Sequence, residues 1–431
     1  MTDRTVGGSS FAVPAAPAPN PDAVRRRGIA FLAAALCLNF QFFFSVGHNF
    51  ETHPLAPPLL LEAVLASLIV WAVVYMARAM VLDRVDWLDI LFFVTPPLFV
   101  LTSAILAWTI HGQPIVMGIG EDRRGFAFYF WFLLRPIARR HRLDADAVLW
   151  ALAICAGVYI TAGFVARYAF TEVMRARLIP DFDPRKLRIS SPGEGFAFCA
   201  VAGLVLLLNR SRLLGAAMMG AGWTGMLVIA QTRQVILALL AGSCFAVLVN
   251  RPVRAVFVYF PMALALLVAA ALSGGPLGEV IQAALPNIEE FDSENLEFNT
   301  RYRTFSIVWE GITGSGFTGS GALSLRFHTG LQMWYGRNFF INDVGIFGEI
   351  YRVGVVAIVL YLLWWLTHLR LLARLPTRRD RELMASLLVT VLFLFTAGWI
   401  FRYGYVHAFV ALFAVCALGH GGVDDDGRRE T

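Results

Sequence analysis

Residues 88–110 read LDILFFVTPPLFVLTSAILAWTI, and after Asp89 this stretch has no charged side chain. A helix rises about 1.5 Å per residue, so about 20 apolar residues cross the hydrocarbon core of a bilayer. Similar stretches recur along the chain. The candidate spans are residues 28–46, 57–80, 88–110, 125–138, 146–166, 193–209, 213–231, 234–250, 254–273, 343–367, 383–401 and 404–419. We predict an all-α, polytopic membrane protein of about 12 transmembrane helices.

The composition excludes other classes of protein. Hydrophobic residues make up 58% of the chain, charged residues 15%, and the mean hydropathy is +0.65. A soluble domain has roughly 25% charged residues, and outer-membrane barrels have short alternating segments rather than continuous apolar runs. No polar domain is present that could bind nucleic acid. The five cysteines lie singly in apolar segments, so neither a zinc site nor a disulfide framework is predicted.

The fourth candidate, residues 125–138, is short and contains Arg135-Pro136. It could be a tilted, half-buried or re-entrant element, or it could cross fully. The alternation of arginine-rich loops favours a full crossing, because the loss of one crossing would invert every later loop.

The arginines also predict the orientation. With the N-terminus inside, all the predicted cytoplasmic loops are basic, as the positive-inside rule expects for a bacterial inner-membrane protein. The predicted parts are a disordered cytoplasmic tail at 1–27, spans 1–9 within 28–273, a large periplasmic loop at 274–342, spans 10–12 within 343–419 and a cytoplasmic tail at 420–431.

One outer segment, residues 167–192, has positive charge against this rule. Its candidate substrate-binding residues are Arg175, Arg177, Arg185, Lys186 and Arg188. They are predicted to hold an anionic ligand at the membrane surface, such as a lipid diphosphate. The alternatives are contact with acidic lipid headgroups and pairing with acidic neighbours in the same segment.

Arg233 lies between two apolar runs in GMLVIAQTRQVILALLAG (225–242) with almost no loop. This tight turn places a guanidinium at or just below the outer interface. An ionisable group at such a depth is costly and indicates a functional site, although an arginine can also extend its head to the interface.

Three features follow one another in the large loop. NTRYRTFSIVWEGI (299–312) predicts a helix with Arg301, Arg303 and Trp309, and a glycine-rich turn through Gly319 and Gly321 comes next. A polar cluster then opens the tenth span. Its candidate residues are Asn338, Asn342, Asp343, Glu349 and Arg352, and Arg402 is a further candidate at the start of the last span.

This series resembles the O-antigen ligase / O-antigen polymerase superfamily of bacterial surface-polysaccharide enzymes. The resemblance covers residues 190–365 in motif and the rest only in topology. It implies that Arg233 is one phosphate-binding arginine and that Arg301 or Arg303 is the second. Where ligases have a histidine, this chain has Ile341-Asn342-Asp343 or Arg337-Asn338, and His328 is the only histidine of the loop. This departure favours a polymerase over a ligase.

The reaction implied is glycosyl transfer from a polyprenyl-diphosphate-linked oligosaccharide to a hydroxyl of a growing chain. Arginines would neutralise the charge on the departing diphosphate, so no metal and no cofactor are predicted. The general base would be Asp343, Glu349 or His328. Expected partners are membrane lipids, a chain-length regulator and export machinery. The other hypotheses are an O-antigen ligase that transfers the glycan to a lipid A core, and a transporter or flippase of lipid-linked sugars.

Overall fold

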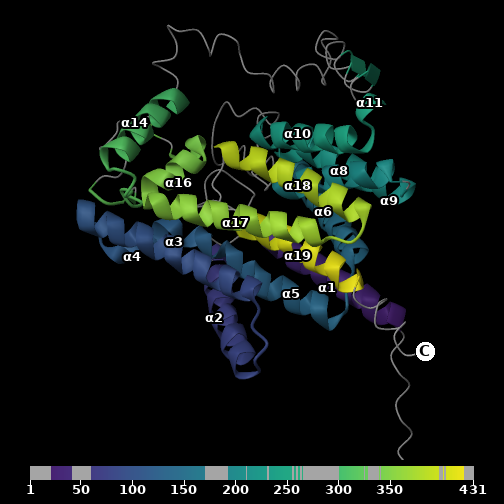
Figure 1. Ribbon diagram of the computed structural model, residues 1–431, viewed down its shortest axis with the longest axis horizontal. Coiled ribbons are helices and arrows are strands. Elements are labelled where there is room, and N and C mark those ends of the chain that lie inside the picture. The colour runs from purple at the N-terminus through teal and green to yellow at the C-terminus, as the bar shows by residue number, and fades with distance from the viewer. Residues whose placement is uncertain are drawn as a thin grey trace, which may run out of the picture.

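The computed structural model describes residues 21–40, 60–169, 193–209, 211–230, 233–254, 257–258, 261–262, 265, 300–324, 326–328, 339, 341–397, 401 and 404–421. These residues form helices and their connections, with no β-strand among them (Figure 1). The helices of the first half are α1 (Pro21–Asn39), α2 (Leu60–Val81), α3 (Trp87–His111), α4 (Ile115–Asp122), η2 (Arg123–Tyr129), α5 (Phe130–Arg140), α6 (Ala145–Ala169) and α8 (Gly193–Leu208). Those that follow are α9 (Arg212–Thr224), η4 (Gly225–Ala230), α10 (Arg233–Asn250), α11 (Pro252–Arg254), α14 (Thr300–Gly314), η8 (Ile341–Val344), α16 (Ile346–Val353), α17 (Val355–Arg374), α18 (Arg378–Ala397) and α19 (Gly404–Gly421).

The third predicted span agrees with α3 to within one residue at each end. The acidic residues before the apolar run explain where the helix starts, because Asp86 accepts a hydrogen bond from the backbone N–H of Asp89 at 3.0 Å and forms a capping box with it. The helix ends at Gly112, whose φ of 71° is in the left-handed region.

The fourth predicted span, residues 125–138, lies in η2 and α5, which follow α4 and run with it antiparallel to α3. At one end, the side chain of Arg135 on α5 is ion-paired with Asp86 and Asp89 at the start of α3. At the other, Ser103 Oγ near the end of α3 donates to Asp122 of α4 at 2.5 Å. The three elements α4, η2 and α5 together therefore return along most of the length of α3.

Two predicted boundaries are wrong. Residues 343–367 do not form one helix, because Gly354 ends α16 with a φ of 61° and the long apolar helix α17 begins only at Val355. Residues 21–27, predicted to belong to a disordered tail, are helical. Their Arg25 pairs with Asp144 at 2.9 Å, which anchors the first turns of α1. The ninth predicted span, residues 254–273, lies mostly outside the described residues.

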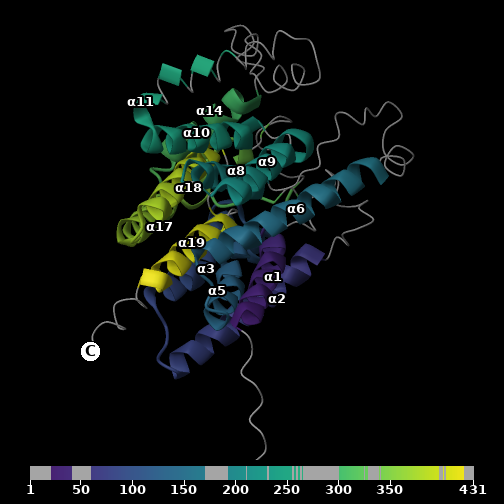
Figure 2. The same ribbon diagram turned by 90° about the vertical axis from the view of Figure 1, so that its right-hand side faces the viewer.

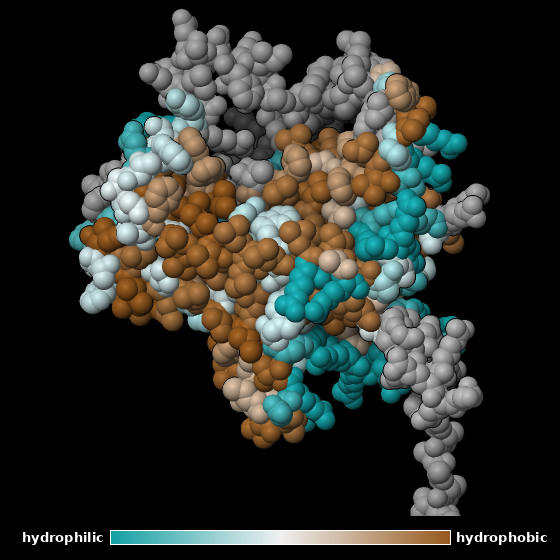
Figure 3. All heavy atoms as spheres, in the orientation of Figure 1, coloured by the Kyte–Doolittle hydropathy of each residue, from teal (hydrophilic) through white to brown (hydrophobic). Residues whose placement is uncertain are grey.

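Among the described residues, four helices are long and apolar enough to cross a membrane: Glu62–Val81, Trp87–His111, Ala145–Ala162 and Val355–Arg374. Gly193–Leu208, Leu213–Ile229, Gln234–Asn250 and Gly404–Gly419 are shorter apolar helices. Large apolar side chains are also exposed along these helices, and Figure 3 shows an apolar band across them. Exposed apolar surface on this scale is that of a membrane protein.

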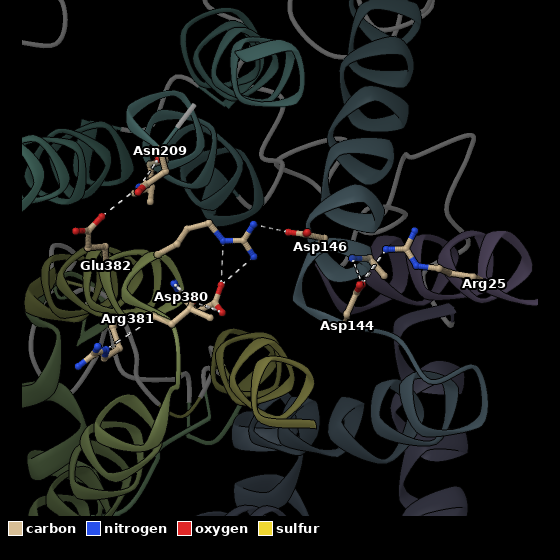
Figure 4. Close-up of polar contacts among 11 residues, drawn as sticks. Arg25, Asp144, Asp146, Asn209, Asp380, Arg381 and Glu382 are labelled. Atoms are coloured by element: carbon tan, nitrogen blue, oxygen red, sulfur yellow. Dashed lines mark hydrogen bonds and ion pairs between the residues drawn. The ribbon is translucent and has the colours of Figure 1, made fainter. Parts of the chain in front are cut away.

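One end of the bundle, which we call the basic end, gathers the arginine-rich loops. It holds the loops α2–α3, α5–α6 and α17–α18, the ends of α8 and α10 and the start of α1, and Figure 2 turns it toward the viewer. Ion pairs connect these segments (Figure 4). They include Arg25–Asp144 at 2.9 Å and Arg379–Asp146 at 3.0 Å. Segments predicted to share one side of the membrane therefore lie together.

Glu382 joins three helices at the basic end. Its carboxylate accepts hydrogen bonds from Asn250 at 2.9 Å and Arg378 at 2.6 Å. It also accepts one from Asn209 at 3.1 Å (Figure 4). Burial opposes the charged form of this carboxyl, but these hydrogen bonds outweigh burial and lower the pKa of Glu382 from its ordinary value.

A lowered pKa in the folded state predicts that Glu382 stabilises the protein at neutral pH. This contribution is lost as the pH falls below the ordinary carboxyl range and through the lower pKa of the folded state. In thermal unfolding scans from pH 7 to pH 3, the wild-type Tm should therefore fall more than that of Glu382→Gln. Equal slopes for the two proteins would contradict this role.

The sulfur atoms of Cys37 on α1 and Cys155 on α6 lie 3.5 Å apart. The sequence did not indicate this pairing, since 118 positions separate the two residues. Treatment of the membranes with diamide should therefore join them, with the two electrons and two protons taken up by the oxidant. Peptide mass mapping should find this cross-link in the wild type and not in Cys37→Ala. A cross-link of Cys37 to another cysteine instead would contradict the packing of α1 on α6.

Candidate functional site

The end of the bundle opposite the basic end holds the predicted arginine helix, the glycine-rich turn and the polar segment before α17. Both α3 and α17 run between the two ends. At this end, the backbone N–H of Val355 donates to the carbonyl of Phe317 at 2.9 Å, whereas near the basic end Arg370 lies over the ring of Trp87. Figure 1 shows α14 and α16 together on this side.

The arginine helix is α14, as the sequence predicts. Its buried side presents Thr304, Val308 and Ile312 to the protein, and Arg303 is exposed in the first turn. Aromatic contacts fix the helix against α16, because the ring of Phe347 lies 5.2 Å from that of Phe305 and 6.1 Å from that of Trp309. The helix that carries Arg301 and Arg303 is therefore held in place relative to the bundle.

The glycine-rich turn connects α14 to the bundle through its backbone. The N–H groups of Ser320 and Gly321 donate to the carbonyls of Tyr351 and Arg352 at 2.7 and 2.8 Å, so the turn caps the end of α16. Gly319 and Gly321 have φ angles of 88° and 75°. A Cβ at Gly321 would overlap the backbone of α3 at Ala107. The two glycines are thus needed for close packing.

Gly321→Ala should lower the free energy of unfolding by about 2–3 kcal/mol, from the backbone overlap together with the left-handed φ. Gly316→Ala is the matched control. Its φ is 60°, but a Cβ added there would meet no atom within 4 Å, so only the strain of about 1 kcal/mol applies. Denaturant titrations in detergent can measure both, and equal losses would show that the close approach to α3 is not needed.

Four buried polar side chains lie next to this turn, and we call them the anchor cluster: Ser103, Gln113, Asp122 and Arg352. Arg352 of α16 is ion-paired with Asp122 of α4, with the two side chains 2% and 1% exposed. Ser103 Oγ donates to Asp122 and accepts from the N–H of Ala322 at 3.0 Å. The cluster therefore joins α3, α4, α16 and the segment of chain after the turn.

Gln113 completes the cluster from the connection between α3 and α4. Its Nε2 donates to the carbonyl of Ala322 at 2.9 Å, and its Oε1 accepts from the N–H of Ser324 at 2.7 Å. One side chain thus satisfies two buried backbone groups of the loop that follows the glycines. Ser103, Gln113 and Asp122 were not predicted from the sequence, although a carboxylate and an amide beside apolar runs were a signal for the cluster.

Two predicted site residues of α16 are buried and contact other parts of the protein. Arg352 holds the anchor cluster, and Glu349, which is 1% exposed, accepts a hydrogen bond from the N–H of Phe401 at 2.7 Å. Phe401 in turn stacks on Phe99 at 4.5 Å. Both residues therefore have a structural role, and a further role in substrate binding stays a prediction.

The other predicted residues are placed to different extents. Arg233 begins α10, and its neighbour Gln234 donates to the carbonyl of Leu394 of α18 at 2.5 Å. Helix α18 also packs against η8, which contains Asn342 and Asp343. The side chains of Arg233, Arg301, Asn342 and Asp343 lie outside the described part of the chain, as do the whole residues Arg175, Arg177, Arg185, Lys186, Arg188, Asn338 and Arg402.

His328 is exposed with a φ of 44°, and its ring lies 4.3 Å from that of Phe327. Within the described residues, no group of three or more His, Cys, Asp or Glu side chains is placed to hold a metal ion. Of the predicted arginines at this end, the described side chains are that of Arg303, which is exposed on α14, and that of Arg352, which is ion-paired with Asp122. Comparisons of the chain with models of protein families, with curated proteins and with solved structures found no match.

Proposed function

We propose that this protein is a membrane glycosyltransferase that polymerises a cell-surface polysaccharide or exopolysaccharide from polyprenyl-diphosphate-linked oligosaccharides. The observation that carries the proposal is the attachment of α14. Aromatic contacts with α16, the glycine-rich turn and the anchor cluster hold the arginine helix at one end of a lipid-facing bundle. A lipid diphosphate in the adjoining membrane surface would meet the arginines of this helix there.

The proposed topology has 12 spans in a bacterial inner membrane, with both termini and the basic end in the cytoplasm. Residues 274–342 then form a periplasmic loop. The gathering of the arginine-rich loops at one end supports this orientation, because positive charge is retained on the cytoplasmic side. Growing chains in the periplasm would pass to a chain-length regulator and export machinery.

In the proposed reaction, an acceptor hydroxyl oxygen attacks the anomeric carbon of the donor. The bond from that carbon to the diphosphate oxygen breaks, and the diphosphate leaves with the bonding electrons. Arg233 and either Arg301 or Arg303 stabilise the charge on the departing oxygens, since fixed cations are more effective in a low-dielectric interface than in water. The hydroxyl proton goes to a base.

The structure bears on the choice of base. Glu349 is buried and holds Phe401, so Asp343 of η8 and the exposed His328 are the better candidates. The exposed aromatic side chains of Tyr302 and Trp309, on the same helix as Arg303, offer apolar faces on which a sugar ring could stack. Both features support a glycan substrate next to an arginine.

The test is to incubate the purified protein in liposomes with defined lipid-linked repeat units. A ladder of longer lipid-linked chains is the expected result. Transfer of a single glycan to a lipid A core, with no ladder, would assign a ligase. Movement of the lipid-linked sugar across the bilayer without a new glycosidic bond would assign a flippase and overturn the proposal.

A further inference from the structure

Helices α3 and α17 pack against each other and leave one apolar stripe each on the outside. Phe92 and Trp364 form an edge-to-face contact at 4.7 Å, and Trp364 Nε1 donates to Thr95 Oγ1 at 3.3 Å. The exposed stripe of α3 comprises Ile90, Val94, Leu98, Leu101, Ile105 and Trp108. That of α17 comprises Val355, Val359, Leu362, Leu363, Leu366 and Leu369. The spacing of three and four residues makes each stripe one face of its helix.

The two stripes meet at the basic end in a cation–aromatic contact. Arg370 extends the stripe of α17 and Trp87 begins that of α3, and the guanidinium carbon lies 5.5 Å from the centre of the indole ring. Trp87 is 38% exposed. An arginine held over an exposed tryptophan at the end of an apolar seam is at the depth where headgroups meet acyl chains.

Arg370 contributes a positive charge that the carboxylates at the start of α3 do not neutralise. The carboxylates at the start of α3, Asp86 and Asp89, already pair with Arg135, and Asp86 also lies 3.6 Å from Arg139. Arg370 has no ion pair among the residues that the structure describes. Arg374 lies one turn further along the same face of α17 and is also exposed.

We infer that the α3–α17 seam binds an anionic phospholipid, with its phosphate on Arg370 beside Trp87 and an acyl chain along the seam. The stripes fit an acyl chain and the exposed guanidinium of Arg370 fits a phosphate, so the two chemistries together indicate a lipid rather than a free anion. A net negative headgroup is favoured because Arg374 adds a second positive charge that a zwitterionic lipid would not balance. This site is at the end opposite α14 and does not depend on the proposed glycosyl transfer.

The test is native mass spectrometry of the full chain in detergent, titrated with cardiolipin or with phosphatidylethanolamine. Arg370→Gln should weaken cardiolipin binding about five-fold, the expected loss for one arginine at a membrane surface. Arg370→Lys, which keeps the charge, should bind more tightly than Arg370→Gln. The control is Arg251→Gln, an exposed arginine of the basic end that follows α10, and it should bind like the wild type.

The inference would be overturned by unchanged cardiolipin binding in Arg370→Gln, by an equal loss in Arg251→Gln, or by phosphatidylethanolamine binding as tight as that of cardiolipin. Displacement of cardiolipin by inorganic phosphate would also overturn it, because that result would indicate a site that binds the phosphate group alone and not the acyl chain. If Arg370→Gln does not fold, Leu366→Gln tests the same seam, since a polar side chain at that exposed position should also weaken cardiolipin binding.

Discussion

Asp122→Ala should lower the free energy of unfolding by about 3–5 kcal/mol, the cost of removing the carboxylate that is ion-paired with a buried arginine. Arg352 is 2% exposed in the structure, so water cannot replace the lost carboxylate without opening the contact between α4 and α16. The same change removes the hydrogen bond from Ser103, which also accepts from the turn after the glycines. The loss should therefore spread to α14.

Glu121→Ala is the matched control, because Glu121 precedes Asp122 on the same short helix and is only half-buried. It should change stability by less than about 0.5 kcal/mol, as for most surface substitutions. A double variant, Asp122→Leu with Arg352→Met, should recover most of the stability, since an apolar pair can replace a buried ion pair. Unfolding by SDS titration can compare the three. A single-variant loss no larger than the control would show that the anchor cluster does not hold α16.

Arg233→Ala should reduce the rate of glycosyl transfer by about 100- to 1,000-fold, as when one fixed donor to a developing anion is removed. The residue begins α10 at the end of the bundle that holds α14. Arg251 directly follows the other end of the same helix, so Arg251→Ala removes the same charge from the basic end. This control should keep full activity.

The comparison must use protein shown to be inserted and folded, for which equal yield and equal Tm in detergent are sufficient. If Arg233→Ala and Arg251→Ala lose activity equally, the effect is on the fold and not on the charge at the site. If Arg233→Ala keeps full activity, Arg233 does not stabilise the leaving group, and the proposed site is wrong at its most specific residue.

The sequence predicted the helices well where apolar runs have charged or glycine boundaries. Helix α3 is such a case, because Asp86, Asp89 and Gly112 mark its two ends. The tenth span was wrong because hydropathy does not register a break at Gly354. Its left-handed φ follows from packing, since a Cβ there would overlap the carbonyl of Phe317 in the distant glycine-rich turn.

The candidate site was also predictable only in part, because some of its contacts join residues that are distant in the sequence. The arginine helix and the glycines could be recognised as neighbours in sequence. The pairing within the anchor cluster could not be recognised, because 230 positions separate Asp122 from Arg352 and no local pattern relates an arginine to such a distant carboxylate. The structure thereby gives the glycine pair a role that the motif alone did not, which is to let the turn approach α3 and cap α16.

The most direct test of the proposed function is to measure polyprenyl diphosphate released in proteoliposomes that contain the full chain and lipid-linked oligosaccharide. Each transfer breaks one bond to a diphosphate and forms one glycosidic bond, so the wild type should release one polyprenyl diphosphate for each repeat unit joined. Arg233→Ala should release it far more slowly, and Arg251→Ala at the wild-type rate. No release from folded wild-type protein, with donor present on both sides of the membrane, would contradict the proposed glycosyl transfer.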